Sequence, residues 1–148
     1  MTFQRIDDAI AAWMQKYGVV SLRIGLAIIF IWFGILKPLG MSPAEELVKR
    51  TVYWFPQDIF FPILGWWEVL IGVFLLYRPT IRLAILLLFL QMPGTALPLV
   101  LLPDVCFTNF PFGLTLEGQY IIKNLVLIAA GIVIGGTVQR VSSGNKIL

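Results

Sequence analysis

Glu68 has the clearest chemical consequence of any residue in the chain, because it lies in the middle of the apolar run 59–77. A carboxylate in hydrocarbon must find a partner or lose its charge, since desolvating an isolated ion is costly. Lys123 lies inside a later apolar run, at a depth close to that of Glu68 if both runs cross a membrane. The sequence therefore predicts that Glu68 and Lys123 form an ion pair inside a helix bundle.

Two uses of such a pair remain open. A buried pair can hold the second and fourth helices in register, and an intramembrane charge can also mark a ligand or proton pathway. Other polar side chains share the same half of the expected bundle, and aromatic rings beside them would suit a flat lipophilic ligand such as a quinone, or form an interfacial belt. The candidate ligand-binding residues are Glu68, Lys123, Asn124, Gln91, Lys37, Trp32 and Trp67.

Composition identifies the elements that must position these residues. Hydrophobic residues make up 59% of the chain and charged residues only 13%, against about 25% charged in soluble domains. The mean hydropathy is +0.90. A helix needs roughly 20 apolar residues to cross a membrane, and four runs are long enough. The expected fold is all-α, a polytopic membrane protein with one domain (1–148) and a four-helix bundle with spans at about 18–36, 59–77, 81–102 and 118–138.

Two further helices are expected outside the spans. Apolar residues recur at helical spacing between Phe3 and Tyr17, which predicts an N-terminal amphipathic helix lying on the membrane. Ser42 and Glu45 have the spacing of a capping box, with Pro43 between them, which predicts a short helix in the first outer loop.

Small residues share helix faces with the polar ones. Gly65, Glu68 and Gly72 lie at spacings of three and four, so the carboxylate projects from a face where another helix can approach closely. The predicted helix-packing glycines are Gly34, Gly65, Gly72, Gly131 and Gly135.

The basic residues predict the orientation of the bundle. Most of those that flank the spans lie beside the two termini and the 77–82 turn, so the positive-inside rule places both termini in the cytoplasm. They are scattered, without a basic run and interleaved aromatics, so no nucleic-acid partner is expected. Arg23, near the cytoplasmic end of the first span, is expected to snorkel to the interface.

The missing residue types exclude several chemistries. The chain has no histidine and one cysteine, Cys106, so bis-histidine haem, imidazole metal sites, histidine-based catalysis and a CxxC redox pair cannot form. We predict no catalytic residue, no haem and no metal, and we interpret Cys106 as an incidental thiol in the outer loop. A redox role would need a bound organic cofactor such as quinone, or a partner subunit.

Three stretches, SLRIGLAIIFIWFGILK (21–37), GWWEVLIGVFLL (65–76) and GQYIIKNLVLIAAGIVIGG (118–136), carry a family resemblance. They resemble the DoxX-like superfamily of small four-helix membrane proteins, and are closest to its branch linked to reactive chlorine resistance. The resemblance implies a bacterial cytoplasmic (inner) membrane protein; some members are subunits of a thiosulfate:quinone oxidoreductase and others belong to oxidative-stress complexes. The motif positions are Arg23, Gly34, Lys37, Glu68, Gly72, Lys123 and Asn124.

Three functional hypotheses follow. The leading one is a small, non-enzymatic subunit or accessory factor of a redox or oxidative-stress-related membrane complex, with membrane lipids and a protein partner subunit or a second copy as its partners. The alternative is a stand-alone binder of quinone or another lipophilic ligand in the polar outer half. The third is a small transporter.

Overall fold

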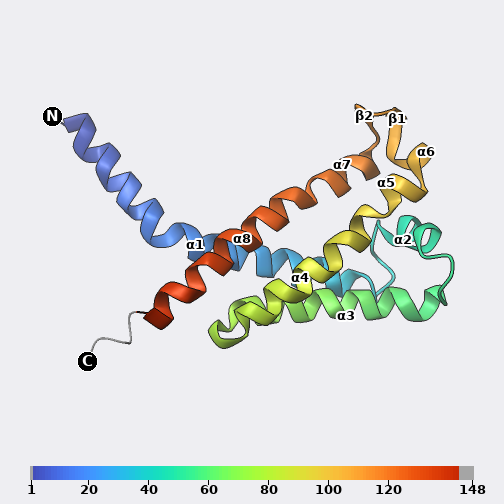
Figure 1. The fold of residues 1–148 in the computed structure, drawn as a ribbon, viewed down its shortest axis with the longest axis horizontal. Helices are drawn as coiled ribbons and strands as arrows, with labels where there is room; N and C mark the ends of the chain where they lie inside the picture. Colours follow the sequence, from blue (N-terminus) through green and yellow to red (C-terminus); the bar gives the residue numbers. More distant parts are fainter. Residues whose placement is uncertain (1, 144–148) are drawn as a thin grey trace.

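The structure is a computed structural model, and it describes residues 2–143 (Figure 1). Four helical segments are long and apolar enough to cross a membrane, which confirms the prediction of an all-α bundle with four candidate spans. A 3-10 turn, η1 (Arg78–Thr80), joins the second segment to the third. The segments are α1 (Thr2–Leu36), α3 (Gln57–Leu76), α4 (Ile81–Ala96) extended by α5 (Pro98–Leu101), and α7 (Leu116–Ile122) extended by α8 (Asn124–Ser143).

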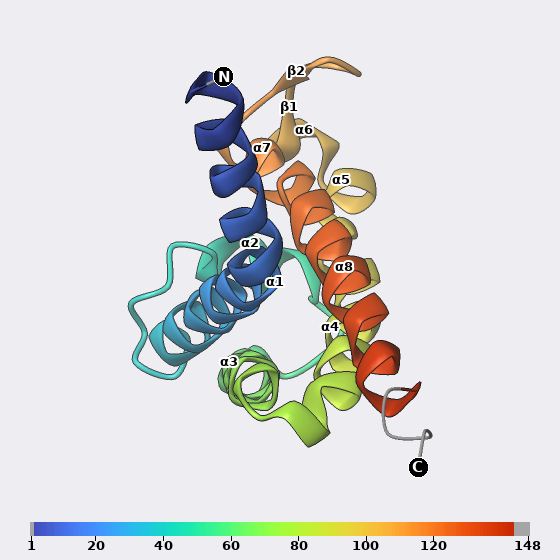
Figure 2. The same cartoon turned by 90° about the vertical axis from the view of Figure 1, so that its left-hand side faces the viewer.

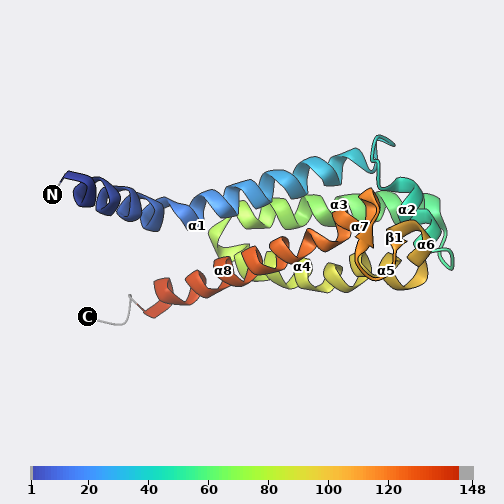
Figure 3. The same cartoon turned by 90° about the horizontal axis from the view of Figure 1, so that it is seen from above.

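The four segments form a ring in which α1 packs on α3, α3 on α4, α4 on α8 and α8 on α1. Figure 2 looks onto the end of the bundle from which both termini emerge, here named the terminal end. The opposite end, the loop end, carries α2 (Glu45–Thr51), α6 (Pro103–Cys106) and a hairpin of β1 (Phe107–Asn109) and β2 (Gly113–Leu114) (Figure 3). The first described helix thus begins, and the last one ends, at the same end of the bundle, as an even number of antiparallel passes requires.

Apolar side chains lie both inside and outside the ring. The buried core includes Ala27, Ile71, Leu75, Leu88 and Ile134, which come from all four segments. Many large apolar residues are nevertheless exposed around the outside of the bundle. A soluble protein rarely exposes so much contiguous apolar surface, whereas a lipid bilayer would cover it.

Helices α1 and α3 approach each other more closely than ordinary side chains would allow. A Cβ atom built on Gly65 would lie 2.6 Å from the Gly34 carbonyl oxygen, and one built on Gly72 would lie 2.7 Å from the Ala27 carbonyl oxygen. Real Cβ atoms do not come so near to backbone atoms, so the contact depends on glycine at these positions. A Cβ atom built on Gly131 or Gly135 of α8 would have its nearest neighbour, a side chain of α4, at 3.6 or 3.3 Å, so α8 packs on α4 less tightly than α1 packs on α3.

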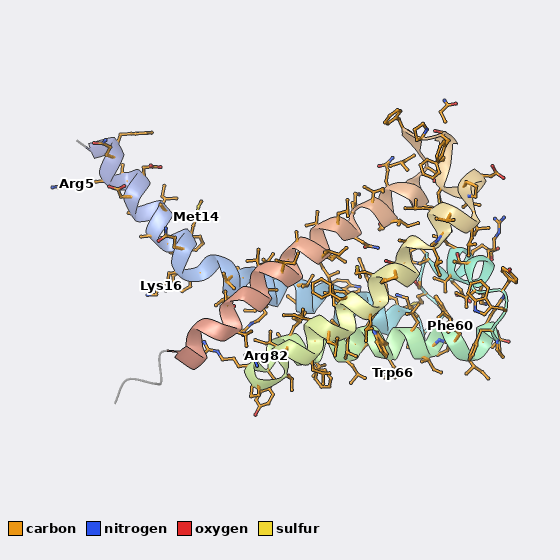
Figure 4. All side chains as sticks on the ribbon, viewed as in Figure 1. Arg5, Met14, Lys16, Phe60, Trp66 and Arg82 are labelled. Atoms are coloured by element: carbon orange, nitrogen blue, oxygen red, sulfur yellow. The ribbon has the colours of Figure 1, made fainter. Side chains whose placement is uncertain are left out.

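The N-terminal amphipathic segment is helical, but it is continuous with the first span rather than a separate helix. Arg5, Met14 and Lys16 lie on this part of α1, which projects beyond the terminal end of the bundle (Figure 4). Its apolar side chains, Phe3 and Trp13 among them, are exposed. The projecting part therefore has no packing partner within the described chain.

The predicted loop helix is present as α2, and it begins at Glu45. Ser42 Oγ accepts a hydrogen bond from the Ala44 amide at 3.4 Å, one residue earlier than the Glu45 amide that a capping box would use. Glu45 and Lys49, both half-buried, form an ion pair of 2.7 Å one turn apart on α2, and the hydrogen bond from Lys49 to Glu45 raises the pKa of Lys49.

Candidate functional site

Glu68 is buried, and two side chains from other elements bind it. Its Oε2 atom forms an ion pair with Lys37 Nζ, directly after α1, and its Oε1 atom accepts a hydrogen bond of 2.7 Å from Gln91 Nε2 on α4. Lys37 Nζ also donates to the Phe33 carbonyl oxygen at 3.4 Å. The exposed fractions of Lys37, Glu68 and Gln91 are 7%, 9% and 9%, so this polar triad lies inside the apolar bundle.

The close contact of α1 and α3 places the ion pair. A Cβ atom built on Gly65 would lie 2.8 Å from Lys37 Cβ, so the base of the lysine side chain lies directly against this glycine. Glu68 follows Gly65 by three residues, so both face α1. A larger residue at position 65 would push the lysine away from the carboxylate.

The predicted pairing of Glu68 with Lys123 is wrong. Lys123 is exposed at the junction of α7 and α8, and its Nζ atom lies 5.4 Å from the centre of the Tyr120 ring. The reason is the order of helices around the ring: α3 packs on α1 and α4, whereas α8 lies diagonally across from it. Similar depth therefore did not bring the two charges together, and Lys37 satisfies Glu68 from the adjacent helix.

A cavity of about 130 Å³ lies beside the triad. All four segments contribute to its wall, and Asn124 and Leu127 supply the α8 side. Four of the seven residues proposed from the sequence therefore share one cavity, namely Lys37, Glu68, Gln91 and Asn124. The complete lining is Ile29, Phe30, Phe33, Lys37, Glu68, Gln91, Met92, Thr95, Asn124 and Leu127.

The two tryptophans proposed as aromatic walls lie elsewhere. Trp32 is 64% exposed on the outside of α1, and Trp67 packs against the core with its Nε1 donating to the Leu87 carbonyl oxygen at 3.3 Å. Phe30 and Phe33 line the cavity in their place. Phe33 precedes Lys37 by four residues, so the two share one face of the helix.

One polar atom of the triad has no hydrogen-bond partner among the described residues. Gln91 Oε1 is buried, and no donor among the described residues lies within hydrogen-bonding distance. Since Gln91 Nε2 donates to the carboxylate of Glu68, which can only accept while paired with a lysine, the amide oxygen must face away from Glu68. An unpaired buried acceptor costs about 1–3 kcal/mol, so it marks a place where a further donor would be favourable.

Arg23 and the Cys106 thiol lie outside this site. Arg23 is about 21 Å from Lys37 along the helix axis, given a rise of about 1.5 Å per residue, and its Nε atom is buried without a partner among the described residues. Cys106 is buried at the loop end. Within residues 2–143 no three His, Cys, Asp or Glu side chains cluster as metal ligands would.

Comparisons of the chain with protein-family models, curated proteins and solved structures give no significant match. The function of the site therefore has to be argued from its own geometry.

Proposed function

We propose that the chain is a multi-pass membrane protein that binds the headgroup of a small lipophilic molecule of the quinone class beside Lys37, Glu68 and Gln91. The cavity is the observation that carries this proposal. It combines buried polar groups with the rings of Phe30 and Phe33, the mixture typical of small-molecule sites. Its volume of about 130 Å³ suits a single ring, since an engineered protein cavity of about 150 Å³ holds benzene.

The location of the cavity supports a ligand that arrives from the membrane. Ile29 and Phe33 line the cavity and are also about half exposed on the outer surface of α1. They lie seven and three residues before the end of α1, within the candidate span. In a bilayer the part of the cavity wall formed by Ile29 and Phe33 would face lipid acyl chains, so a lipophilic molecule could enter the cavity between these side chains from the side.

The orientation and location of the protein belong to the same proposal. Basic residues favour a cytoplasmic terminal end, which would put the cavity in the outer leaflet. The resemblance to DoxX-like proteins favours the bacterial cytoplasmic membrane. Fusions of alkaline phosphatase after Arg140 should be inactive, and an active fusion would reverse this orientation.

Binding can be tested with a short-chain benzoquinone and its reduced form in lipid nanodiscs. We expect saturable binding of at least one of the two with about one site per chain. Phe33→Ala should weaken it because the ring wall is lost, whereas the exposed Lys123→Met should bind as the unaltered protein does. Absence of saturable binding by either form, or equal binding by both variants, would contradict the proposal.

A second function, as an accessory subunit of a redox-related membrane complex, is favoured by the projecting part of α1. Arg5, Ile6, Ile10 and Trp13 line a shallow surface groove there, with no covering element in the described chain. A photo-crosslinker at Ile10 should yield a protein adduct in native membranes. Adducts with lipid alone would indicate that this segment lies on the membrane surface without a protein partner.

A further inference from the structure

We infer that the ligand of the cavity carries a ring hydroxyl that donates a hydrogen bond to Gln91 Oε1. The site would then prefer a hydroquinone or phenol over the corresponding quinone or ether. This inference rests on the proposed function and adds to it the chemical form that is recognised.

The orientation of the Gln91 amide is fixed by the ion pair behind it. Lys37 binds one oxygen of Glu68, and the other oxygen accepts from Gln91 Nε2 at 2.7 Å. Rotating the amide by half a turn would place two acceptors against each other, which is unfavourable. The ion pair therefore acts as a positioning element, because it directs the buried Oε1 atom of Gln91, a residue that lines the cavity, away from Glu68.

Thr95 adds a second acceptor to the same wall. Its hydroxyl donates to the Met92 carbonyl oxygen at 2.8 Å, so its one proton is already used. The Oγ1 atom can then only accept from a ligand. Gln91 and Thr95 thus present acceptors from one face of α4, and a ligand without a donor satisfies neither.

Lys37, which also lines the cavity, supplies a donor. Of its three N–H groups, one serves Glu68 and one the Phe33 carbonyl, which leaves a third. A ring hydroxyl can accept from this ammonium group and donate to Gln91 at the same time, whereas a quinone carbonyl can only accept. Asn124 can present either end of its amide, so it does not favour one form over the other.

The test compares ligands that differ only in the donor. A short-chain hydroquinone and its quinone are titrated anaerobically into the protein in nanodiscs. A phenol and its methyl ether are titrated in the same way, because these two compounds are not a redox couple and do not interconvert during the measurement. We expect each hydroxyl compound to bind at least about fivefold more tightly than its partner, because the cost of an unmatched buried acceptor, about 1–3 kcal/mol, corresponds to about 5- to 150-fold in affinity.

Variants assign the preference to Gln91. Gln91→Met removes the acceptor at similar volume and should reduce the preference to less than about threefold, whereas Lys123→Met should keep it. If Gln91→Met does not fold, the phenol and methyl ether pair in the unaltered protein still decides the question.

The outcomes separate the two proposals. Failure of all four compounds to bind would overturn the proposed function itself. Binding of quinone and ether as tightly as of hydroquinone and phenol would keep the proposed function and overturn the hydroxyl preference. A preference that survives in a folded Gln91→Met variant would also overturn it, because the donor would then be recognised by another residue.

Discussion

Helix α1 meets its two neighbours in different ways. Against α3 it packs through Gly34 and Gly65, whose backbones approach so closely that an added Cβ on either would overlap the other helix. Against α8 it leaves room for the cavity, whose wall includes Ile29 and Phe33 on one side and Leu127 on the other. The α1–α3 contact and the α1–α8 contact therefore serve different purposes within one ring.

The difference teaches how a small bundle can hold a buried charge pair beside a cavity. The α1–α3 contact fixes the positions of Lys37 and Glu68, which lie on facing elements. The α1–α8 contact, with larger side chains and no comparable glycine contact, leaves space next to that pair. In membranes close helix packing depends on small residues, because lipid offers no hydrophobic drive for helix association.

The largest expected effect comes from breaking the ion pair at the α1–α3 contact. Glu68→Leu or Lys37→Met alone should lower the free energy of unfolding by about 3–5 kcal/mol, because each leaves a buried charge unpaired. The double variant should lose only about 1–3 kcal/mol, since it leaves the neutral Gln91 amide without its acceptor. Unfolding in bicelles followed by a double-mutant cycle measures this coupling.

The exposed lysine provides the control for that cycle. Lys123→Met should change stability by less than about 0.5 kcal/mol, as expected for a surface position. Additive effects of the Glu68 and Lys37 substitutions, or a strong coupling of Glu68 with Lys123, would contradict the assigned partner.

The next effect concerns the glycines of the α1–α3 contact. Gly65→Ala should destabilise by about 1–3 kcal/mol, because its Cβ would lie 2.6 Å from the Gly34 carbonyl oxygen and backbone atoms would have to move. A Cβ atom built on Gly25 of α1 would have no atom of another element within 4 Å. Gly25→Ala should therefore be neutral or stabilising by up to about 1 kcal/mol. Equal effects of the two substitutions in the same unfolding measurement would mean that the helices are not in close contact.

Sequence reasoning identified the spans and the need of Glu68 for a partner, because both follow from hydropathy and from the cost of a bare charge. It misidentified the partner. Depth can be read from residue position along a span, whereas the order of helices around the ring depends on packing contacts that one sequence does not display. For the same reason Trp32 and Trp67 were proposed as cavity walls where Phe30 and Phe33 lie.

Local irregularities are harder to predict than the spans. Either proline of the third segment could break its helix, yet Pro98 begins a new helix, α5, whereas Pro93 lies inside α4 without ending it. The β1–β2 hairpin had no clear signal, because its paired segments contain only three and two residues. Such short strands carry too little alternation to stand out from a loop.

A smaller effect is expected on the opposite side of the ring from the α1–α3 contact, where α8 packs on α4. Gly131 lies on α8, and a Cβ atom there would have its nearest neighbour, Phe89 Cζ, at the ordinary contact distance of 3.6 Å. Gly131→Ala should therefore stabilise by up to about 1 kcal/mol through higher helix propensity, the opposite sign to Gly65→Ala. A loss of more than about 1 kcal/mol would show that α8 packs as tightly as α3 does.

The last prediction concerns the loop end of the bundle, where α6 packs against α7. It changes the reactivity of one thiol and is expected to affect the fold least. Cys106 is fully buried there, and its carbonyl oxygen accepts from the Thr115 amide at 3.0 Å, next to the start of α7. Burial, with a smaller contribution from Glu117, raises the pKa of the Cys106 thiol. Only the thiolate reacts with iodoacetamide. Cys106 should therefore react at least about tenfold more slowly than the exposed thiol of the double variant Cys106→Ser, Asn109→Cys.

The pH dependence of that reaction separates a raised pKa from simple shielding. A raised pKa keeps Cys106 protonated at pH values where the cysteine at position 109 is already partly ionised, so its rate should begin to increase at higher pH. A slow reaction with the same pH profile as position 109 would indicate shielding alone. Equal rates at both positions would show that reagent reaches Cys106 freely, and that the loop end does not cover the bundle at α7.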